Sequence, residues 1–258
     1  MRVGVCGAGG RMGREVCRAV VGEEDLQLVC AVDPAFEGRR LAELVPGLES
    51  DVVVRGDVGA MPEAGVEVAV DFTVAEAARA NLPRLLRQGI PCVVGTTGFT
   101  EKDLEELDRA AREGGVGCLV APNFAVGAVL MMDFARRAAR YMEECEIVEL
   151  HHPAKLDAPS GTARNTARLV LEARGKEEAE ESEEGPRGLS MGGIHIHSVR
   201  LPGLVAHQEV IFGGKGQVLT IRHDSLDRTS FMPGVLLAVR RVGEVSGLVL
   251  GLEKVMDL

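Results

Sequence analysis

The sequence predicts an α/β protein in which a doubly wound parallel sheet is followed by an α+β part with a mixed or antiparallel sheet. Two observations support this prediction. Up to Ala121, short apolar strand-like runs alternate with helix-like segments, a pattern typical of a parallel sheet covered on both faces. After Pro122, Pro-Gly and Gly-Gly-Lys-Gly turns join β-type segments that are expected to be adjacent strands of an antiparallel sheet. We therefore expect two structural parts.

In the first part, apolar runs and helical spacing alternate from the N-terminus. Strands are expected at 2–6, 26–32, 66–72, 91–94 and 116–121, and helices at 12–20, 76–88 and 101–112. In the second part, helices are expected at 125–141 and 162–174, and β segments at 194–201, 206–212 and 217–222. A helix at 233–242 and a strand at 248–252 end the chain, and the acidic stretch 176–184 is expected to be a solvated loop.

The composition excludes several classes of partner. The 258 residues carry a formal net charge of −10 without a basic cluster, so nucleic acid and anionic membranes are not expected to bind. No long uncharged apolar run is present that could span a membrane. The 6 cysteines are scattered, mostly within apolar runs, and no C-x-x-C pair occurs. This use of cysteine favours a reducing, cytoplasmic location.

A glycine-rich loop, Gly7-Ala8-Gly9-Gly10-Arg11-Met12-Gly13, lies between the first strand and the first helix. Glycines at such a corner let the backbone approach a pyrophosphate, and the helix start supplies N–H donors. Asp33 ends the second strand, where a carboxylate can bind a ribose 2′-hydroxyl. The alternative is a tight structural turn, but the combined context favours dinucleotide binding.

Asp33 also bears on the choice of cofactor. A carboxylate repels a 2′-phosphate, and Pro34 follows where a basic residue would favour NADPH. We therefore expect NADH to be used at least as well as NADPH. Four arginines could still bind the phosphate from nearby: Arg11, Arg14, Arg39 and Arg40.

Two further corners follow predicted strands. Gly95-Thr96-Thr97-Gly98 lies at the carboxyl end of a strand, where its amides and hydroxyls could hold the nicotinamide amide. Ala121-Pro122-Asn123-Phe124 ends the next strand and could form a wall or hinge beside the nicotinamide. A common turn and an Asn-assisted helix start are the respective alternatives.

The run from Glu149 to Thr162 concentrates chemistry-bearing side chains. An apolar strand leads into His151, His152 and Lys155, and Pro159-Ser160-Gly161-Thr162 opens a helix. A histidine four residues before a lysine places a proton donor beside a positive charge, and a helix start can bind a carboxylate. A simple helix cap could account for Ser160, but not for the His-His-x-x-Lys pattern.

Together these segments resemble the 4-hydroxy-tetrahydrodipicolinate reductase (dihydrodipicolinate reductase) family of bacterial lysine and diaminopimelate synthesis. The resemblance covers essentially the whole chain, and the run from His151 to Thr162 is its most specific part. Further matching segments are the glycine loop, 71–73, 94–99, 121–124, 207–209 and 223–231.

The resemblance implies an NAD(P)H-dependent reduction of a cyclic imine dicarboxylate to tetrahydrodipicolinate by a cytoplasmic homotetramer. It implies a Rossmann-type dinucleotide-binding domain at 1–124, a substrate-binding and tetramerisation domain at 125–228, and a segment at 229–258 that returns to the first domain. His151 would be the catalytic proton donor and acceptor, and Lys155 a second donor. Substrate would bind at His152, Ser160, Gly161 and Thr162. The cofactor would bind at Gly7, Ala8, Gly9, Gly10, Arg11, Met12, Asp33, Gly95, Thr96, Thr97, Ala121, Pro122, Asn123 and Phe124.

Other interpretations of these residues fit the chain less well. Lys155 could form a Schiff base in a lyase, but that leaves the nucleotide loop without a role. His195 and His197 share a β face, but no cysteine or carboxylate stands at ligand spacing, so no metal site is expected. Arg228 could form a structural ion pair or face a carboxylate. Another two-domain nicotinamide oxidoreductase and a non-catalytic dinucleotide sensor are the rival functions.

Overall fold

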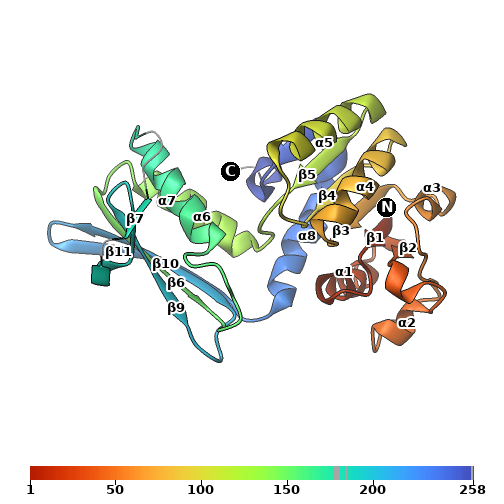
Figure 1. The fold of residues 1–258 in the computed structure, drawn as a ribbon, viewed down its shortest axis with the longest axis horizontal. Coiled ribbons are helices and arrows are strands. Elements are labelled where there is room, and N and C mark those ends of the chain that lie inside the picture. Colours follow the sequence, from red (N-terminus) through yellow and green to blue (C-terminus); the bar gives the residue numbers. More distant parts are fainter. Residues whose placement is uncertain (177–180, 184, 257) are drawn as a thin grey trace. The chain divides into compact units, whose positions relative to one another are not determined.

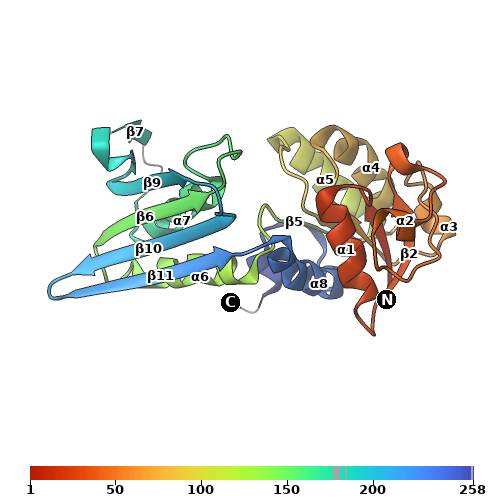
Figure 2. The ribbon, with the colours of Figure 1, turned by 90° about the horizontal axis from the view of Figure 1, so that it is seen from below.

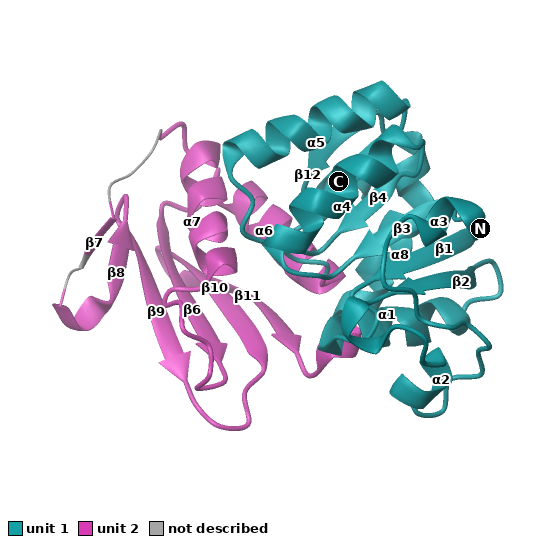
Figure 3. Cartoon of the chain, turned by 45° about the vertical axis from the view of Figure 1, so that its right-hand side comes forward, with its two compact units in different colours: residues 1–124, 231–258 teal, residues 125–230 magenta. Residues whose placement is uncertain are grey.

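The computed structural model describes the whole chain except residues 177–180, 184 and 257, and it divides into two compact units. Unit 1 comprises residues 1–124 and 231–258, and unit 2 comprises residues 125–230 (Figure 3). Each unit contains one six-stranded sheet.

In unit 1 every pairing within the sheet is parallel. Its strand order is β12 (Gly247–Leu250), β5 (Gly117–Val120), β4 (Cys92–Val94), β3 (Val68–Asp71), β1 (Arg2–Cys6) and β2 (Gln27–Val32). The chain passes from β1 to β2 on one side and then returns to β3 on the other. The loops after β1 and β3 therefore flank a topological switch point, where open α/β sheets bind ligands.

Helices cover both faces of this sheet (Figure 1). α4 (Ala75–Arg87) packs against α5 (Glu101–Gly114), whereas α1 (Arg11–Val21) packs against α8 (Met232–Arg241). The leucines of α4 and α5 bury against the sheet face that carries Cys6, Cys92 and Cys118. Two short helices, α2 (Leu41–Leu44) and α3 (Ala60–Glu63), lie between β2 and β3.

In unit 2 the sheet is mixed. Its order is β11 (Gln217–Ser225), β10 (Ala206–Gly214), β6 (Glu144–His151), β9 (Ile194–Arg200), β8 (Leu189–Met191) and β7 (Glu181–Glu183). β6 and β9 run parallel, and the other pairings are antiparallel. α6 (Val126–Ala138) and α7 (Gly161–Ala173) lie along one face of this sheet (Figure 2).

The burial pattern of β6 shows which face is covered. Cys145, Ile147 and Glu149 are buried, whereas Glu146, Val148 and Leu150 are only partly buried. Because side chains alternate along a strand, Glu149 and His151 lie on the same face of the sheet as the buried Ile147. Glu149 is therefore a carboxylate in the core of unit 2.

Two expectations for unit 2 were wrong. The Pro-Gly turn was expected to join adjacent strands, but β6 lies between β9 and β10 and pairs with both. Turn residues report only local chain reversal, and the inserted strand comes from earlier in the chain. In the acidic stretch, Glu181–Glu183 forms the edge strand β7 and not a loop, while 177–180 and 184 lie outside the described residues.

The short elements α2, α3, β7 and β8 had no expected counterpart, because they have three or four residues and show no periodicity. 3-10 turns are found at Pro34–Phe36, Gly185–Arg187, Arg228–Phe231, Val242–Glu244 and Leu252–Val255. In the described part of the chain, no helix combines the length and apolar character needed to cross a membrane.

Candidate active site

The glycine loop follows β1 in unit 1. Glycine is needed at several positions of this loop, for a different structural reason at each. Gly7 has φ +74°, a conformation that L side chains rarely adopt. A Cβ at Gly13 would lie 2.0 Å from the carbonyl oxygen of Gly7, and one at Gly9 would lie 2.1 Å from the Phe36 ring. Gly10 precedes α1 without a side-chain cap. A bare helix start behind a close-packed glycine turn fits a pyrophosphate.

Asp33 ends β2 beside this loop. Its Oδ2 accepts a hydrogen bond from the Gly9 N–H at 2.9 Å, and its Oδ1 accepts one from the Ala35 N–H at 3.1 Å. The structure therefore brings Asp33 to the glycine loop. Of the four arginines named above, Arg14 donates to the Gly9 carbonyl and Arg39 pairs with Glu43, and Arg11 and Arg40 are exposed.

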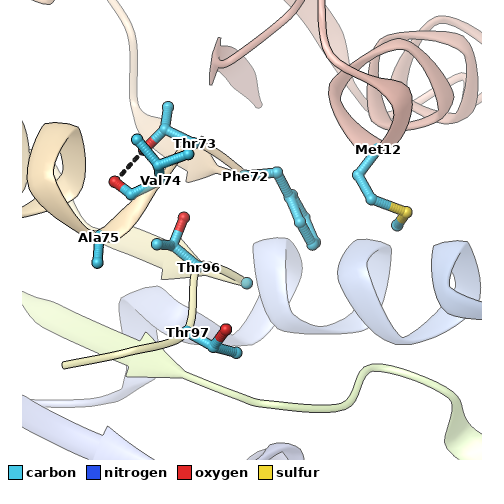
Figure 4. Close-up of a pocket in the computed structure, with 8 residues that line it drawn as sticks. Met12, Phe72, Thr73, Val74, Ala75, Thr96 and Thr97 are labelled. Carbon is cyan, nitrogen blue, oxygen red and sulfur yellow. Dashed lines mark hydrogen bonds between the residues drawn. The ribbon is translucent and has the colours of Figure 1, made fainter. Parts of the chain in front are cut away.

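A pocket of about 430 Å3 opens at the carboxyl ends of β1, β3 and β4 in unit 1. Met12 reaches it from α1, and Phe72, Thr96 and Thr97 reach it from the loops after β3 and β4 (Figure 4). Its other lining residues are Thr73, Val74, Ala75 and Gly95. The pocket thus unites the predicted Met12 with the predicted Gly95–Thr97 corner.

Beneath the pocket lies Asp71, which is completely buried at the end of β3. Its Oδ1 accepts hydrogen bonds from the Thr96 hydroxyl at 2.6 Å and the Thr73 hydroxyl at 2.8 Å. Burial raises the pKa of Asp71, although these hydrogen bonds counteract part of the effect. One carboxyl group therefore organises the two loops that line the pocket.

Of the corner after β5, Ala121 and Phe124 are buried, Pro122 is exposed and Asn123 is partly exposed. The Phe124 ring lies 5.7 Å from the Phe72 ring. Phe124 thus supports a pocket-lining side chain, whereas no residue from 121 to 124 lines the pocket itself. Phe72 and Thr73 were not among the predicted cofactor residues, although their position after β3, next to the switch point, could have indicated them.

In unit 2, His151 ends β6 and Ser160 begins α7. Nδ1 of His151 lies 2.5 Å from Oε2 of Glu149, and the imidazole is 14% exposed. The Ser160 hydroxyl accepts from the Ala163 N–H at 3.2 Å and caps the helix. Arg200 forms a two-pronged ion pair with Glu149, at 2.8 and 2.9 Å.

Lys155 lies on the loop between β6 and α7. Its Nζ pairs with Oδ1 of Asp157 at 2.8 Å, and its side chain is 23% exposed. The hydrogen-bonded ion pair with Lys155 lowers the pKa of Asp157 below its ordinary value. His152 and Gly161 are exposed, Thr162 is partly exposed, and a Cβ at Gly161 would meet nothing within 4 Å. The loop therefore presents an imidazole, an ammonium and an open helix start.

The remaining candidates have partners within unit 2. His197 Nε2 lies 2.9 Å from Oε2 of Glu146, and His207 Nδ1 lies 2.6 Å from Oδ1 of Asp224. His195 is buried. Among the described residues, no group of three or more His, Cys, Asp or Glu side chains has a geometry that could hold a metal ion.

A doubly wound sheet with a glycine loop in unit 1, and an imidazole and an ammonium on one loop of unit 2, are typical of dinucleotide-dependent oxidoreductases. Comparison with known proteins supplies the particular family. Residues 1–124 match "Dihydrodipicolinate reductase, N-terminus", and residues 127–256 match "Dihydrodipicolinate reductase, C-terminus". The chain belongs to the dihydrodipicolinate reductase family.

Individual proteins of this family are similar to the chain over nearly its whole length. The 4-hydroxy-tetrahydrodipicolinate reductase of Listeria welshimeri is 50% identical over the full length of both chains. That of Bacillus pumilus is 46% identical over 100% of this chain and 98% of its own. The structure of dipicolinate-bound dihydrodipicolinate reductase from Paenisporosarcina sp. TG-14 superimposes with a TM-score of 0.84 and 41% identity, over 98% of each chain.

The activity is therefore the reduction of 4-hydroxy-tetrahydrodipicolinate in lysine biosynthesis, with NAD(P)H as the family's reductant. Membership of this family excludes the three alternative functions considered from the sequence, namely a lyase, a different oxidoreductase and a non-catalytic sensor. The sequence-based predictions of family, fold class and reaction are confirmed.

Proposed function

We propose that the loop from His151 to Thr162 performs the proton chemistry and binds the dicarboxylate. The observation that carries this proposal is that one short loop, between β6 and α7, holds His151, Lys155 and an open helix start at Gly161. The Paenisporosarcina enzyme, which is 41% identical, was solved with dipicolinate, a ligand of the same dicarboxylate class. An ammonium and oriented N–H groups are suited to binding carboxylates.

In this mechanism the reduced nicotinamide supplies a hydride when it is bound. His151 exchanges a proton through Nε2, because Nδ1 is held by Glu149. Lys155 neutralises a substrate carboxylate and is the second proton donor, which requires it to leave Asp157. His152, Ser160, Gly161 and Thr162 contact the substrate. The protein's part is to orient the reactants and supply protons.

For the cofactor, we propose that the dinucleotide lies on residues 7–12 and Asp33, with the nicotinamide toward 95–97 and 121–124. The close-packed glycines and uncapped α1 support a pyrophosphate there. NADH should serve at least as well as NADPH, because the Asp33 carboxylate stands at the glycine loop, where it would repel a 2′-phosphate.

The test is cofactor oxidation with substrate generated in place by the preceding synthase from pyruvate and aspartate semialdehyde. We expect kcat/KM with NADH to equal or exceed that with NADPH. A large NADPH preference would overturn the assignment of Asp33 but leave the reaction unchanged. His151→Gln should lose turnover while NADH binding persists, and unchanged turnover would remove His151 from the mechanism.

We also propose a cytoplasmic homotetramer in which residues 125–228 supply the contacts. Within the described residues, α6 and α7 pack on one face of the unit 2 sheet, and the opposite face carries the partly exposed Val148 and Leu150. A second copy would cover the part of that face around Val148 and Leu150. Light scattering should give four times the 27.4 kDa chain mass, and a monomer in solution would contradict the proposal.

A further inference from the structure

The buried Glu149 carboxylate of unit 2 contacts His151, Ser160 and Arg200 at the same time. It is 0% exposed, and Oε2 faces both His151 Nδ1 at 2.5 Å and Arg200 Nη1 at 2.9 Å. Oε1 accepts from the Ser160 N–H at 3.2 Å and from Arg200 Nη2 at 2.8 Å. The two oxygens thus contact the end of β6, the start of α7 and the last residue of β9.

The ionisation state of Glu149 determines which His151 nitrogen carries the proton. Burial alone would raise the pKa of Glu149, but the hydrogen bonds from His151 and Arg200 outweigh it and lower the pKa to about 2. An ionised carboxylate can only accept hydrogen bonds. Nδ1 must therefore be the donor, which leaves Nε2 as the ring atom that gains or loses a proton. Nε2 makes no hydrogen bond to any described residue.

We propose that Glu149 is a positioning residue that holds His151 as the Nδ1–H tautomer and directs Nε2 to the substrate, with Arg200 fixing the carboxylate. The proposal rests on the proposed role of His151. It also links acid–base chemistry to substrate binding, because the same carboxylate holds the first residue of the Ser160–Thr162 helix start. Arg200 further donates to the Asp157 carbonyl at 2.7 Å, so the loop between β6 and α7 is tied down at two points.

The variant Glu149→Gln reverses the tautomer without changing the shape of the side chain. If the new amide group replaces Oε1, its hydrogens face two donors, the Ser160 N–H and Arg200 Nη2. If it replaces Oε2, only Arg200 Nη1 opposes it, because His151 can present an unprotonated Nδ1 instead. The second orientation has fewer conflicts. Ser198, which also interacts with Glu149, does not decide between them, since a hydroxyl can donate or accept.

The unit contains a matched control on the same strand. Glu146 interacts with His197 and Arg187 just as Glu149 interacts with His151 and Arg200, but it lies on the opposite face of β6 and its side chain is 40% exposed. Glu146→Gln removes the same charge from the same strand. It should leave the His151 tautomer and turnover unchanged.

The experiment is long-range 1H–15N NMR of histidine-labelled full-length protein at pH 8.5, with the His151 signals assigned by His151→Gln. The wild type and Glu146→Gln should show a protonated Nδ1 at His151, and Glu149→Gln a protonated Nε2. In the coupled assay, kcat of Glu149→Gln should fall by between about 10²- and 10⁴-fold. The KM for NADH should not change. Glu149→Asp, which keeps the charge, should retain the wild-type tautomer and recover part of kcat.

The outcomes distinguish the positioning role of Glu149 from proton transfer by His151. A protonated Nδ1 in Glu149→Gln would overturn the positioning role, even if kcat fell. An inverted tautomer with unchanged turnover would support the positioning role and would instead refute proton transfer by His151. If Glu149→Gln does not fold, Glu149→Asp decides: a protonated Nε2 in that variant would overturn the proposal.

Discussion

The buried Glu149 carboxylate should make the stability of unit 2 depend on pH in the acid range. Its pKa is about 2 in the folded protein against an ordinary value of 4.5. Because the folded value is the lower one, the stabilisation is fully present above about pH 4.5 and is lost as the pH falls toward 2. At about 1.36 kcal/mol for each pH unit of difference, the complete loss is about 3 kcal/mol, of which about 2 kcal/mol has gone by pH 3.

Urea unfolding of the wild type and Glu149→Gln between pH 3 and 5 measures this contribution. Circular dichroism follows the whole chain, and emission from Tyr141, the only Tyr in a chain without Trp, reports on unit 2. Glu149→Gln should be the less stable protein near pH 5, because Arg200 loses its charged partner. The difference in unfolding free energy between the wild type and Glu149→Gln should be about 2 kcal/mol smaller at pH 3 than at pH 5.

The same comparison with Glu146→Gln controls for loss of a carboxylate on β6. The ion pairs of Glu146 with Arg187 and His197 are partly exposed, so solvent and salt screen them. The difference in unfolding free energy between the wild type and Glu146→Gln should therefore change little with pH. Parallel stability curves for the wild type and Glu149→Gln would refute the reasoning. They would mean that Glu149 has an ordinary pKa and does not hold its neighbours as an ion.

Three further substitutions test the two binding regions. Gly13→Ala should destabilise unit 1 by more than about 2 kcal/mol, because the new methyl group would lie 2.0 Å from the Gly7 carbonyl oxygen. An unchanged melting temperature would contradict this prediction. Gly161→Ala should change the free energy of unfolding by less than about 0.5 kcal/mol, because a methyl group at this position would meet no neighbouring atom within 4 Å. It should nevertheless raise the substrate KM. An unchanged KM would mean that the substrate binds elsewhere. Asp157→Asn should release Lys155 from its ion pair and so lower the substrate KM. The decrease should be no more than about fivefold, because exposed ion pairs contribute little free energy. A higher KM would show that Asp157 aids substrate binding.

How much the sequence predicts depends on how local the signal is. Helical periodicity located α1 and α4, because each helix buries one face. Continuous apolar runs located β1 and β3, because these strands are buried on both faces of the sheet. The short elements and the placement of β6 between β9 and β10 carried no such signal. A strand contributed from elsewhere in the chain leaves no trace in the turn that joins its two neighbours.

For the site, the sequence alone determined the reaction family and the residues that carry chemical groups. The glycine loop and the run from His151 to Thr162 are contiguous, so their residue types and spacing can be read directly. The tertiary structure alone decided how those groups are held. Arg200 meets Glu149 from 51 positions away, and Asp71 bonds Thr96 across 25. Pairing between strands creates these contacts, and it is burial in the folded unit that makes a single carboxylate able to fix a tautomer and orient a loop.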